Sequence, residues 1–320
     1  MRLALAGDTM LGRHVGRAIL QAQRPPFAGE VVAAAAEGDL FVLNLECCIS
    51  DRGQRWPEPS KPFFFRAPPA AAELLARAGV NCVTLANNHA LDYGAQALLD
   101  TLEYLSAVDI ACVGAGPDMA SARAPRVLSA GRLRLAVLGL ADGPAAYAAG
   151  PAEPGIAWAD LRREDLGGWP TDAVAAAARD VDVVLVSPHW GPNMTVAPEP
   201  YVRRAARALV GAGATLVAGH SAYVVHGVAP RVLYDLGDFV DDYRVDARLR
   251  NDLGLLFLVD LDARGPRRLE ALPLKLEHCH TRLARGEDAE WITRRFIDAC
   301  AELGTDAAQH DDRIIIADLR

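Results

Sequence analysis

The sequence predicts an α/β fold, because short apolar runs rich in Val, Leu and Thr alternate with segments of helical character. A second observation supports this class: several of the apolar runs end in a polar turn just before the next helix. The clearest case is residues 79–94, where a buried strand predicted over residues 80–86 delivers Asn87, Asn88 and His89 at its end. Open α/β sheets place their sites at such carboxyl ends.

The first half of the chain is predicted to alternate strands and helices around one long irregular loop. Strands are expected at residues 2–6, 40–45, 80–86 and 111–113, and helices at 13–23, 30–37, 70–78 and 90–105. The loop spans residues 50–69 and combines several prolines with three consecutive phenylalanines, so it excludes long regular elements. A loop of this length in a compact domain is usually functional.

The second half is predicted to continue the same alternation and then to close with a hairpin, a helix and a strand. Strands are expected at residues 134–140, 181–187, 215–218 and 232–236, helices at 173–178 and 200–211, a hairpin from 255–260 and 268–275, a closing helix at 288–302 and a last strand at 313–317. Because no linker and no internal repeat is visible, residues 1–320 are expected to form a single domain, with 286–320 as its closing segment.

Composition narrows the class of protein. The formal net charge is −8, which argues against a binder of nucleic acid. The six cysteines form no C-x-x-C pair, which fits a reducing compartment without a disulfide framework. No apolar run approaches the length of a membrane span, and the sequence opens directly on a predicted strand. We therefore expect a cytoplasmic protein, and the oligomeric state stays open.

Polar ligand-type residues follow five of the predicted strands. They are Asp8, Glu46, Asn88 with His89, His189 and His220. In a parallel sheet these junctions lie along one edge, so the side chains are expected to converge. Carboxylate, amide and imidazole ligands suit Mn, Fe, Zn or Mg better than a thiolate metal. A pair of such ions activates water and clamps a phosphoryl or carbonyl oxygen, and His89 would then serve as an acid or base beside them.

Together these segments carry a family resemblance. The sequence resembles the CapA family of encapsulation and poly-γ-glutamate synthesis proteins, which is similar to the calcineurin-like metallophosphoesterases. The matching segments, spread over roughly residues 1–260, are G-D-T-M-L-G-R from Gly7, N-L-E from Asn44, K-P-F-F-F-R from Lys61, L-A-N-N-H-A-L-D-Y-G from Leu85, V-G-A-G from Val113, S-P-H-W-G from Ser187, G-H-S-A-Y-V-V-H-G from Gly219 and L-Y-D-L-G-D-F-V-D-D-Y from Leu233.

The resemblance implies a calcineurin-like four-layer α-β-β-α sandwich with two mixed sheets and the site at the strand ends. It assigns metal ligation to Asp8, Glu46, Asn88, His189 and His220. It makes His89 the acid that protonates a leaving group. Lys61 and Arg13 become cationic contacts for an anionic substrate. The implied activity is hydrolysis of a phosphoester or of a peptide or γ-glutamyl amide, with a dinuclear metal centre.

Three departures from the metallophosphoesterase pattern affect the metal assignment. Met10 stands where D-x-H would supply a histidine, and Tyr223 stands where G-H-x-x-H would supply another. A phenol is a poor ligand near neutral pH because its pKa is about 10. Asp238 replaces an asparagine common in relatives and, with Asp241 and Asp242, is expected to solvate a loop. The expected cofactor is therefore a divalent metal or none at all. His226 would either replace the histidine that is missing at Tyr223 or contact the substrate.

Two other functional classes stay open. Without a metal, Tyr223 paired with His89 or His220 would be an acid–base set for epimerisation at a peptide Cα, with Asp8 and Glu46 as further acids or bases. The analogy is to metal-independent peptide epimerases of natural-product pathways. In that case the aromatic loop from Phe63 to Phe65, with Trp190, would hold a peptide side chain. Asn87 is expected to contact the substrate in either enzyme class. The third class is a capsule-assembly protein without catalysis.

Overall fold

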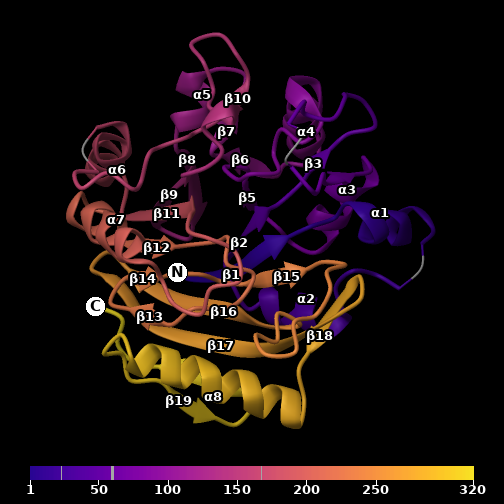
Figure 1. Ribbon diagram of the computed structural model, residues 1–320. Coiled ribbons are helices and arrows are strands. Elements are labelled where there is room, and N and C mark those ends of the chain that lie inside the picture. The colour runs from indigo at the N-terminus through magenta and orange to yellow at the C-terminus, as the bar shows by residue number, and fades with distance from the viewer. Residues whose placement is uncertain (23, 59–60, 167) are drawn as a thin grey trace.

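The chain folds as two β-sheets stacked face to face with helices on their outer faces, as the computed structural model in Figure 1 shows. The structure describes residues 1–22, 24–58, 61–166 and 168–320. Two expectations extend outside these ranges. Gln23 ends the helix predicted over residues 13–23, and Pro59 and Ser60 belong to the predicted irregular loop; all three lie outside the described residues.

The larger sheet is mixed. Its strands are β1 (Arg2–Thr9), β2 (Leu40–Leu45), β5 (Cys82–Thr84), β6 (Ala111–Val113), β15 (Asp238–Val240), β16 (Leu253–Asp262), β17 (Gly265–Glu277), β18 (His280–Leu283), β19 (Ala308–His310) and β20 (Arg313–Ile316). They run in the order β19-β20-β17-β16-β1-β2-β5-β6, with β15 beside β1 and β18 beside β17. β1, β2, β5 and β6 are parallel, whereas β16 is antiparallel to β1.

The smaller sheet is also mixed. Its strands are β8 (Arg126–Ala130), β9 (Leu133–Ala141), β11 (Val183–His189), β12 (Leu216–Ala218), β13 (Val228–Ala229) and β14 (Val232–Leu233). The order is β13-β14-β12-β11-β9-β8, with a parallel centre and antiparallel edges. Short pairs lie outside both sheets: β3 (Cys48–Ile49) with β4 (Arg66–Ala67), and β7 (Ala115–Gly116) with β10 (Gly155–Ile156).

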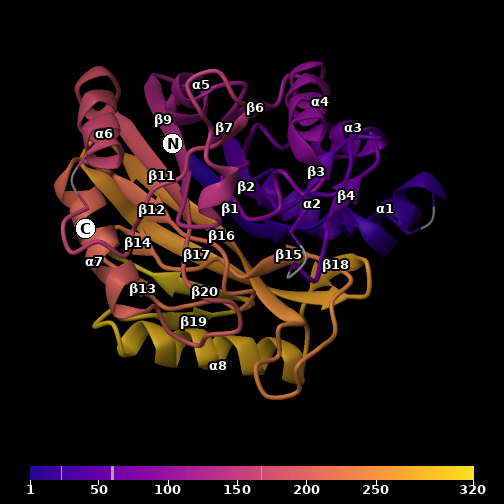
Figure 2. The same cartoon turned by 45° about the horizontal axis from the view of Figure 1, so that its top comes forward.

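Helices form the two outer layers, so the predicted four-layer α-β-β-α sandwich is confirmed. The outer face of the larger sheet is covered by α1 (Arg13–Leu20), α2 (Gly29–Ala35), α3 (Ala70–Arg77) and α4 (Gly94–Ser106). The smaller sheet is covered by α6 (Trp169–Asp180) and α7 (Pro200–Gly211). Figure 2 shows these two groups on opposite sides, with α8 (Glu287–Ala301) along the lower edge. Two short helices, α5 (Met119–Arg123) and η1 (Ala145–Tyr147), lie in connections.

One core lies between the sheets and another between the larger sheet and its helices, so both faces of the central strands are buried. Leu3 and Leu5 of β1 pack against Val137 of β9 and Leu185 of β11, whereas Ala4 faces the helices on the other side of its sheet. Burial on both faces explains why these strands are continuous apolar runs instead of alternating ones. α8 covers the part of β16 and β17 that the smaller sheet leaves open.

Several element boundaries differ from the predictions for a tertiary reason. β1 continues through Asp8 to Thr9, because β15 pairs with it there. The helix expected from residue 90 begins at Gly94, and the strand expected over 80–86 is confined to Cys82–Thr84. The segment between them forms turns whose side chains build the site. The β8 strand was not predicted, because its exposed, irregular sequence has no period-two pattern. The predicted hairpin is confirmed as β16 and β17.

The two sheets approach each other closely at a pair of glycines, Gly139 and Gly114. A Cβ added to Gly139 of β9 would lie 2.5 Å from Thr84 Oγ1 and 2.9 Å from the Cα of Gly114. These contacts are shorter than any real Cβ contact, so the larger sheet leaves no room for a side chain at residue 139.

We therefore expect Gly139→Ala to lower the free energy of unfolding by about 1–3 kcal/mol, because the added methyl group forces the sheets apart. The matched control is Gly211→Ala at the end of α7, where an added Cβ has no neighbour within 4 Å. Urea unfolding monitored by circular dichroism measures both. Equal stability of the Gly139→Ala variant and the wild type would contradict the close approach of the sheets.

Candidate functional site

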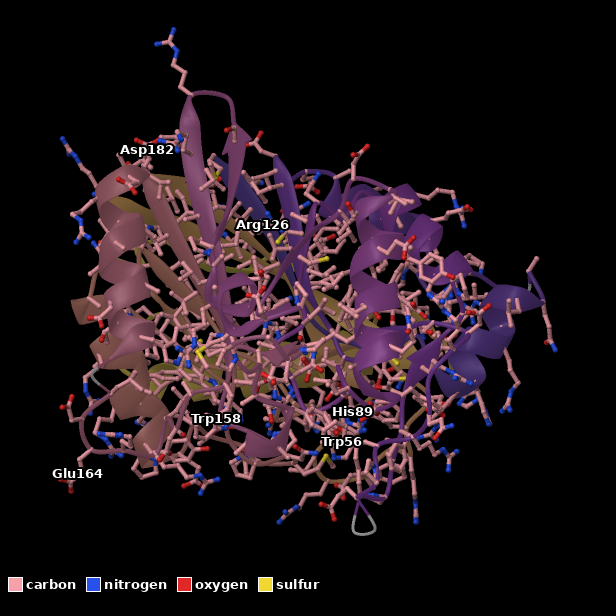
Figure 3. All side chains as sticks on the ribbon, turned by 90° about the horizontal axis from the view of Figure 1, so that it is seen from above. Trp56, His89, Arg126, Trp158, Glu164 and Asp182 are labelled. Atoms are coloured by element: carbon pink, nitrogen blue, oxygen red, sulfur yellow. The ribbon has the colours of Figure 1, made fainter. Side chains whose placement is uncertain are left out.

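The polar residues predicted to converge do meet, but they come from both sheets. Asp8 lies in β1 and Glu46 directly follows β2, so both belong to the larger sheet. His189 ends β11 and His220 follows β12 in the smaller sheet, and a β-bridge joins these two histidines. The predicted single sheet edge is thus replaced by two strand-end edges that face each other. Figure 3 shows His89 at the end of the molecule opposite Asp182, which precedes β11.

The centre of the site is a compact cluster of ligand-type atoms. One ligand atom from each of Asp8, Glu46 and His189 lies within 4.8 Å of the other two. His189 Nε2 is 3.6 Å from Glu46 Oε1, and His220 Nδ1 is 3.4 Å from Asp8 Oδ1. Asp8, Glu46, His189 and His220 are each at most 5% exposed. The burial of such groups is unfavourable unless each of them has a partner.

Hydrogen bonds from neighbouring segments fix the orientation of the cluster. Asn44 Nδ2 donates to Asp8 Oδ1 at 2.6 Å, and the backbone N–H of Ser221 donates to Asp8 Oδ2 at 3.2 Å. Tyr243 donates its hydroxyl to Glu46 Oε2 at 3.2 Å. Ser187 Oγ lies 3.0 Å from His220 Nε2, which leaves Nδ1 of that ring facing Asp8. Residues in the shell around a metal commonly orient its ligands in this way.

The atoms that face one another inside the cluster lack hydrogen-bond partners. Within the described chain, Glu46 Oε1, His189 Nε2, His220 Nδ1 and Asn88 Oδ1 are buried and make no hydrogen bond. A buried polar atom without a partner costs roughly 1–3 kcal/mol. Such atoms on four residues predicted as ligands fit a bound cation, and those of Glu46 and His189 lie, with Asp8, close enough together to share one. The donor set, with two carboxylates, one amide and two imidazoles, suits a divalent metal.

The protonation equilibria of the cluster are interdependent. Burial raises the pKa of Glu46 to about 8, and the adjacent Asp8 charge acts in the same direction. Burial also acts in this direction on Asp8, but contacts with His220, His189 and Asn44 outweigh it and lower the pKa of that carboxyl. Burial lowers the pKa of both His189 and His220, so the neutral, metal-ligating form of each ring is favoured.

His89 forms a dyad with Asp92 beside the cluster. Its Nδ1 lies 2.6 Å from Asp92 Oδ2, and its Nε2 faces Glu46 Oε1 at 4.0 Å. Phe65 stacks on the imidazole with a ring separation of 4.0 Å. The ring is therefore held in one orientation with Nε2 toward the cluster, as a general acid requires. Sequence reasoning missed Asp92, although the His-x-x-Asp spacing within one turn was a usable signal.

Asp92 also anchors a cation at the mouth of a large cavity. Lys61 Nζ lies 3.1 Å from Asp92 Oδ1 and donates to the backbone oxygen of Asn88 at 2.7 Å. The cavity has a volume of about 460 Å³, and its walls include Lys61, Asn88, His189 and Ser221. We refer to it as the first cavity. Its size suits a small molecule or a short stretch of polymer.

Two of the residues predicted to contact substrate are buried and bonded within the protein itself. Trp190 is 2% exposed, packs in the core of the smaller sheet and donates its indole N–H to Tyr234 O at 2.9 Å. Asn87 uses its amide to bond Asn44 and Leu45 and to accept from the N–H of His89, so it shapes the loop. The structure therefore does not bring these two side chains into the cluster, because core packing and hydrogen bonds within the protein occupy them.

His226 is likewise not brought to the cluster. Its Nε2 lies 2.9 Å from the backbone oxygen of Thr195, and burial lowers the pKa of the ring to about 4. The loop carries the ring toward Thr195, so His226 does not replace the histidine that Tyr223 displaces. Met10 also points elsewhere: it is buried in the core, and its sulfur lies 3.1 Å from the backbone nitrogen of Gly12.

Arg13, Phe65 and Tyr223 line a separate cavity of about 280 Å³, which we call the second cavity. Arg13 pairs with Asp242 Oδ1 at 3.3 Å, and its guanidinium lies 5.7 Å from the ring centre of Phe65. Tyr223 packs against Tyr243 with a ring separation of 5.3 Å.

The acidic loop after β14 is buried instead of solvated, contrary to expectation. Asp238 is 2% exposed, and Asp241 and Asp242 are each 7% exposed. Burial raises the pKa of Asp241 to about 6, and burial together with Asp241 raises the pKa of Asp238 well above its usual value. Three aspartates within five residues predicted side chains in contact with water. The pairing of β15 with β1 instead places this segment inside the protein.

Comparison with known proteins places this site in context. Residues 2–243 match the sequence model of the family described as "Bacterial capsule synthesis protein PGA_cap". The chain is 32% identical over 281 residues to a "Probable polyglutamine synthesis accessory protein" of Mycobacterium tuberculosis, which covers 81% of this chain and 73% of that protein. It is 26% identical over 284 residues to "Capsule biosynthesis protein CapA" of Bacillus anthracis, with 87% and 68% covered.

A solved structure shares the fold. A hypothetical protein from Thermus thermophilus superimposes with a TM-score of 0.51 at 14% identity, covering 87% of this chain and 100% of that one. Within the residues that the structure describes, no helix is both long and apolar enough to cross a bilayer.

The buried carboxyl of Asp241 gives a pH-dependent prediction. Its folded pKa of about 6 lies above the unfolded value of about 3.9, so the folded state holds the proton longer and stability falls as pH rises between them. Asp241→Asn removes this titration. We expect the variant to gain on the order of 1–3 kcal/mol relative to the wild type between pH 4 and pH 7. Urea unfolding at both pH values measures this gain, and a pH-independent difference would contradict it.

Proposed function

The chain belongs to the family of bacterial capsule synthesis proteins, and from this premise we propose that it is a metal-dependent hydrolase acting on an amide or phosphoester bond in capsule or polyglutamate synthesis. The observation that supports hydrolysis most directly is the group of buried, unpaired ligand atoms on Glu46, Asn88, His189 and His220 around Asp8. A purely structural protein would satisfy or exclude such atoms, because leaving them unpaired is destabilising.

Asp8, Glu46, Asn88, His189 and His220 would hold the ion. A divalent cation bound there supplies Lewis acidity, which polarises the scissile carbonyl or phosphoryl oxygen and lowers the pKa of water. Met10 and the Tyr223 ring both lie against other partners, so the two histidines of a fully ligated dinuclear centre have no counterparts among the described residues. One tightly held ion is therefore the form of the site that these residues support best.

His89 supplies the proton in this proposal. Asp92 holds Nδ1, so Nε2 is the atom that faces the reacting bond and passes a proton to the leaving nitrogen or oxygen. The Asp92 carboxylate stabilises the imidazolium before transfer, and Phe65 prevents the ring from rotating. Lys61, on the same carboxylate, presents an ammonium to an anionic substrate in the first cavity.

Two alternatives predict different results for the same measurements. An epimerase would need Tyr223 and His89 or His220 to face opposite sides of one substrate Cα, where one removes the proton and the other returns it. An accessory protein would bind polymer or a partner without turnover, and the name of the mycobacterial relative is of this kind. Solvent deuterium entering a peptide Cα would identify the epimerase.

Metal content tests the site. Protein purified without chelator should carry about one divalent ion per chain, and Asp8→Ala and His189→Ala should each lose it, because both remove a ligand from the cluster. The control is Asp312→Ala, which removes an exposed aspartate elsewhere. Inductively coupled plasma mass spectrometry gives the content. Wild-type protein that stays metal-free after incubation with Mn²⁺ or Zn²⁺ would remove the basis of the proposal.

A turnover assay tests the role of His89 as the proton donor. We expect His89→Asn to keep the wild-type metal content and to lower kcat by about 10²–10⁴-fold, because the proton donor is lost while the ligands stay. A γ-linked glutamate oligomer and a phosphodiester serve as assay substrates. The exposed His14→Asn variant is the matched control. Full turnover by the His89→Asn variant would exclude His89 as the acid.

A further inference from the structure

The second cavity lies directly against the reacting cluster but opens on its own. Its inner wall includes Phe65, which stacks on His89, and Tyr243, whose hydroxyl donates to Glu46. The first cavity includes His189 and Asn88, which belong to the same cluster. Phe65 and Tyr243 therefore lie between the second cavity and the cluster, and each of them contacts both.

Backbone strain is concentrated around the second cavity. Three of its lining residues have left-handed backbones although none is glycine: Arg13 at φ 50°, Met194 at φ 58° and Tyr223 at φ 65°. Each such residue is unfavourable and persists only where the surrounding structure imposes it. These residues belong to three separate segments that line the second cavity: the start of α1, the loop after β11 and the loop after β12. A space left by chance between loops would not require this strain.

The chemistry of the walls specifies a ligand. Arg13 lies with its guanidinium 5.6 Å from the ring centre of Phe63 and 5.7 Å from that of Phe65. Asp242 Oδ1 lies 3.3 Å from one terminal nitrogen of Arg13, and a guanidinium has five N–H donors, so others are left to bind a ligand. Arg244 supplies a second guanidinium at the mouth, where Phe63 is 55% exposed. Aromatic walls with two arginines suit an organic carboxylate.

We propose that the second cavity is a subsite for a carboxylate-bearing residue of the substrate, next to the bond that reacts. Arg13 and Arg244 bind the carboxylate, and the rings of Phe63, Phe65 and Tyr223 contact the aliphatic part of the residue. The volume of about 280 Å³ fits a single residue, not a longer segment. The inference rests on the proposed function, because a subsite has meaning only beside a reacting centre, and it narrows the substrate to one that carries a carboxylate next to the reacting bond.

Binding, measured apart from turnover, tests this assignment. The full chain carrying His89→Asn is titrated by calorimetry with a pentamer of γ-linked glutamate that has free α-carboxylates, and with the same pentamer as its methyl ester. Arg244→Gln and Arg13→Gln are added to this background. Arg248→Gln is the matched control, because it removes an exposed arginine four residues along the same loop that does not line the cavity.

We expect each cavity substitution to raise the Kd for the free acid about tenfold, which corresponds to one charge-assisted hydrogen bond, and to change the Kd for the ester less than twofold. Arg13→Gln removes the cation that faces buried Asp242 and can disturb folding; exposed Arg244 carries no such risk, so Arg244→Gln decides the matter. Three results would each overturn the subsite: Arg244→Gln raises the Kd for the acid and for the ester equally, it leaves the Kd for the acid unchanged, or the pentamer does not bind at all. A metal-free, inactive wild type that still binds through Arg244 would overturn hydrolysis alone.

Discussion

The site depends on holding an ionised aspartate inside the protein at the junction of the two sheets. Asp8 receives hydrogen bonds from Asn44 of β2 and from the backbone of Ser221, and it faces His220 beyond β12. These contacts join the larger sheet to the smaller one and outweigh the effect of burial on the Asp8 pKa. The neighbouring Gly7 makes this possible, because an added Cβ would lie 1.7 Å from the oxygen of Gly237.

The cluster destabilises the folded state, and this destabilisation is consistent with function. Buried ligand atoms without partners, a glutamate whose pKa is raised to about 8 and left-handed residues in the surrounding loops all oppose folding. The strands that deliver them are buried on both faces, between the inter-sheet core and the helices. A rigid core of this kind can hold the left-handed residues and the unpaired atoms around the site in place. A small sheet with one solvated face could not.

The proline-rich loop that leads into β4 connects the two cavities. Lys61 faces the first cavity and reaches Asp92, Phe65 stacks on His89, and Phe63 stands at the rim of the second cavity. Asp92 accepts from His89, Lys61, Tyr147 and the backbone of Phe65, so one carboxylate sets the position of acid, cation and loop. Under the proposed function, changes in this loop would affect catalysis and substrate choice together.

The sequence by itself determined the α/β class, the strand-end residues Asp8, Glu46, His89, His189 and His220, and the family. Strand periodicity and polar turns are local properties, and each of these residues sits where a local pattern ends. Only the tertiary structure decided that the ligands come from two facing sheets, that Asp92 orients His89, and that Trp190, Asn87 and His226 point elsewhere. Side-chain direction and the burial of Asp238, Asp241 and Asp242 depend on which strand pairs with which, and that pairing joins residues more than 200 positions apart.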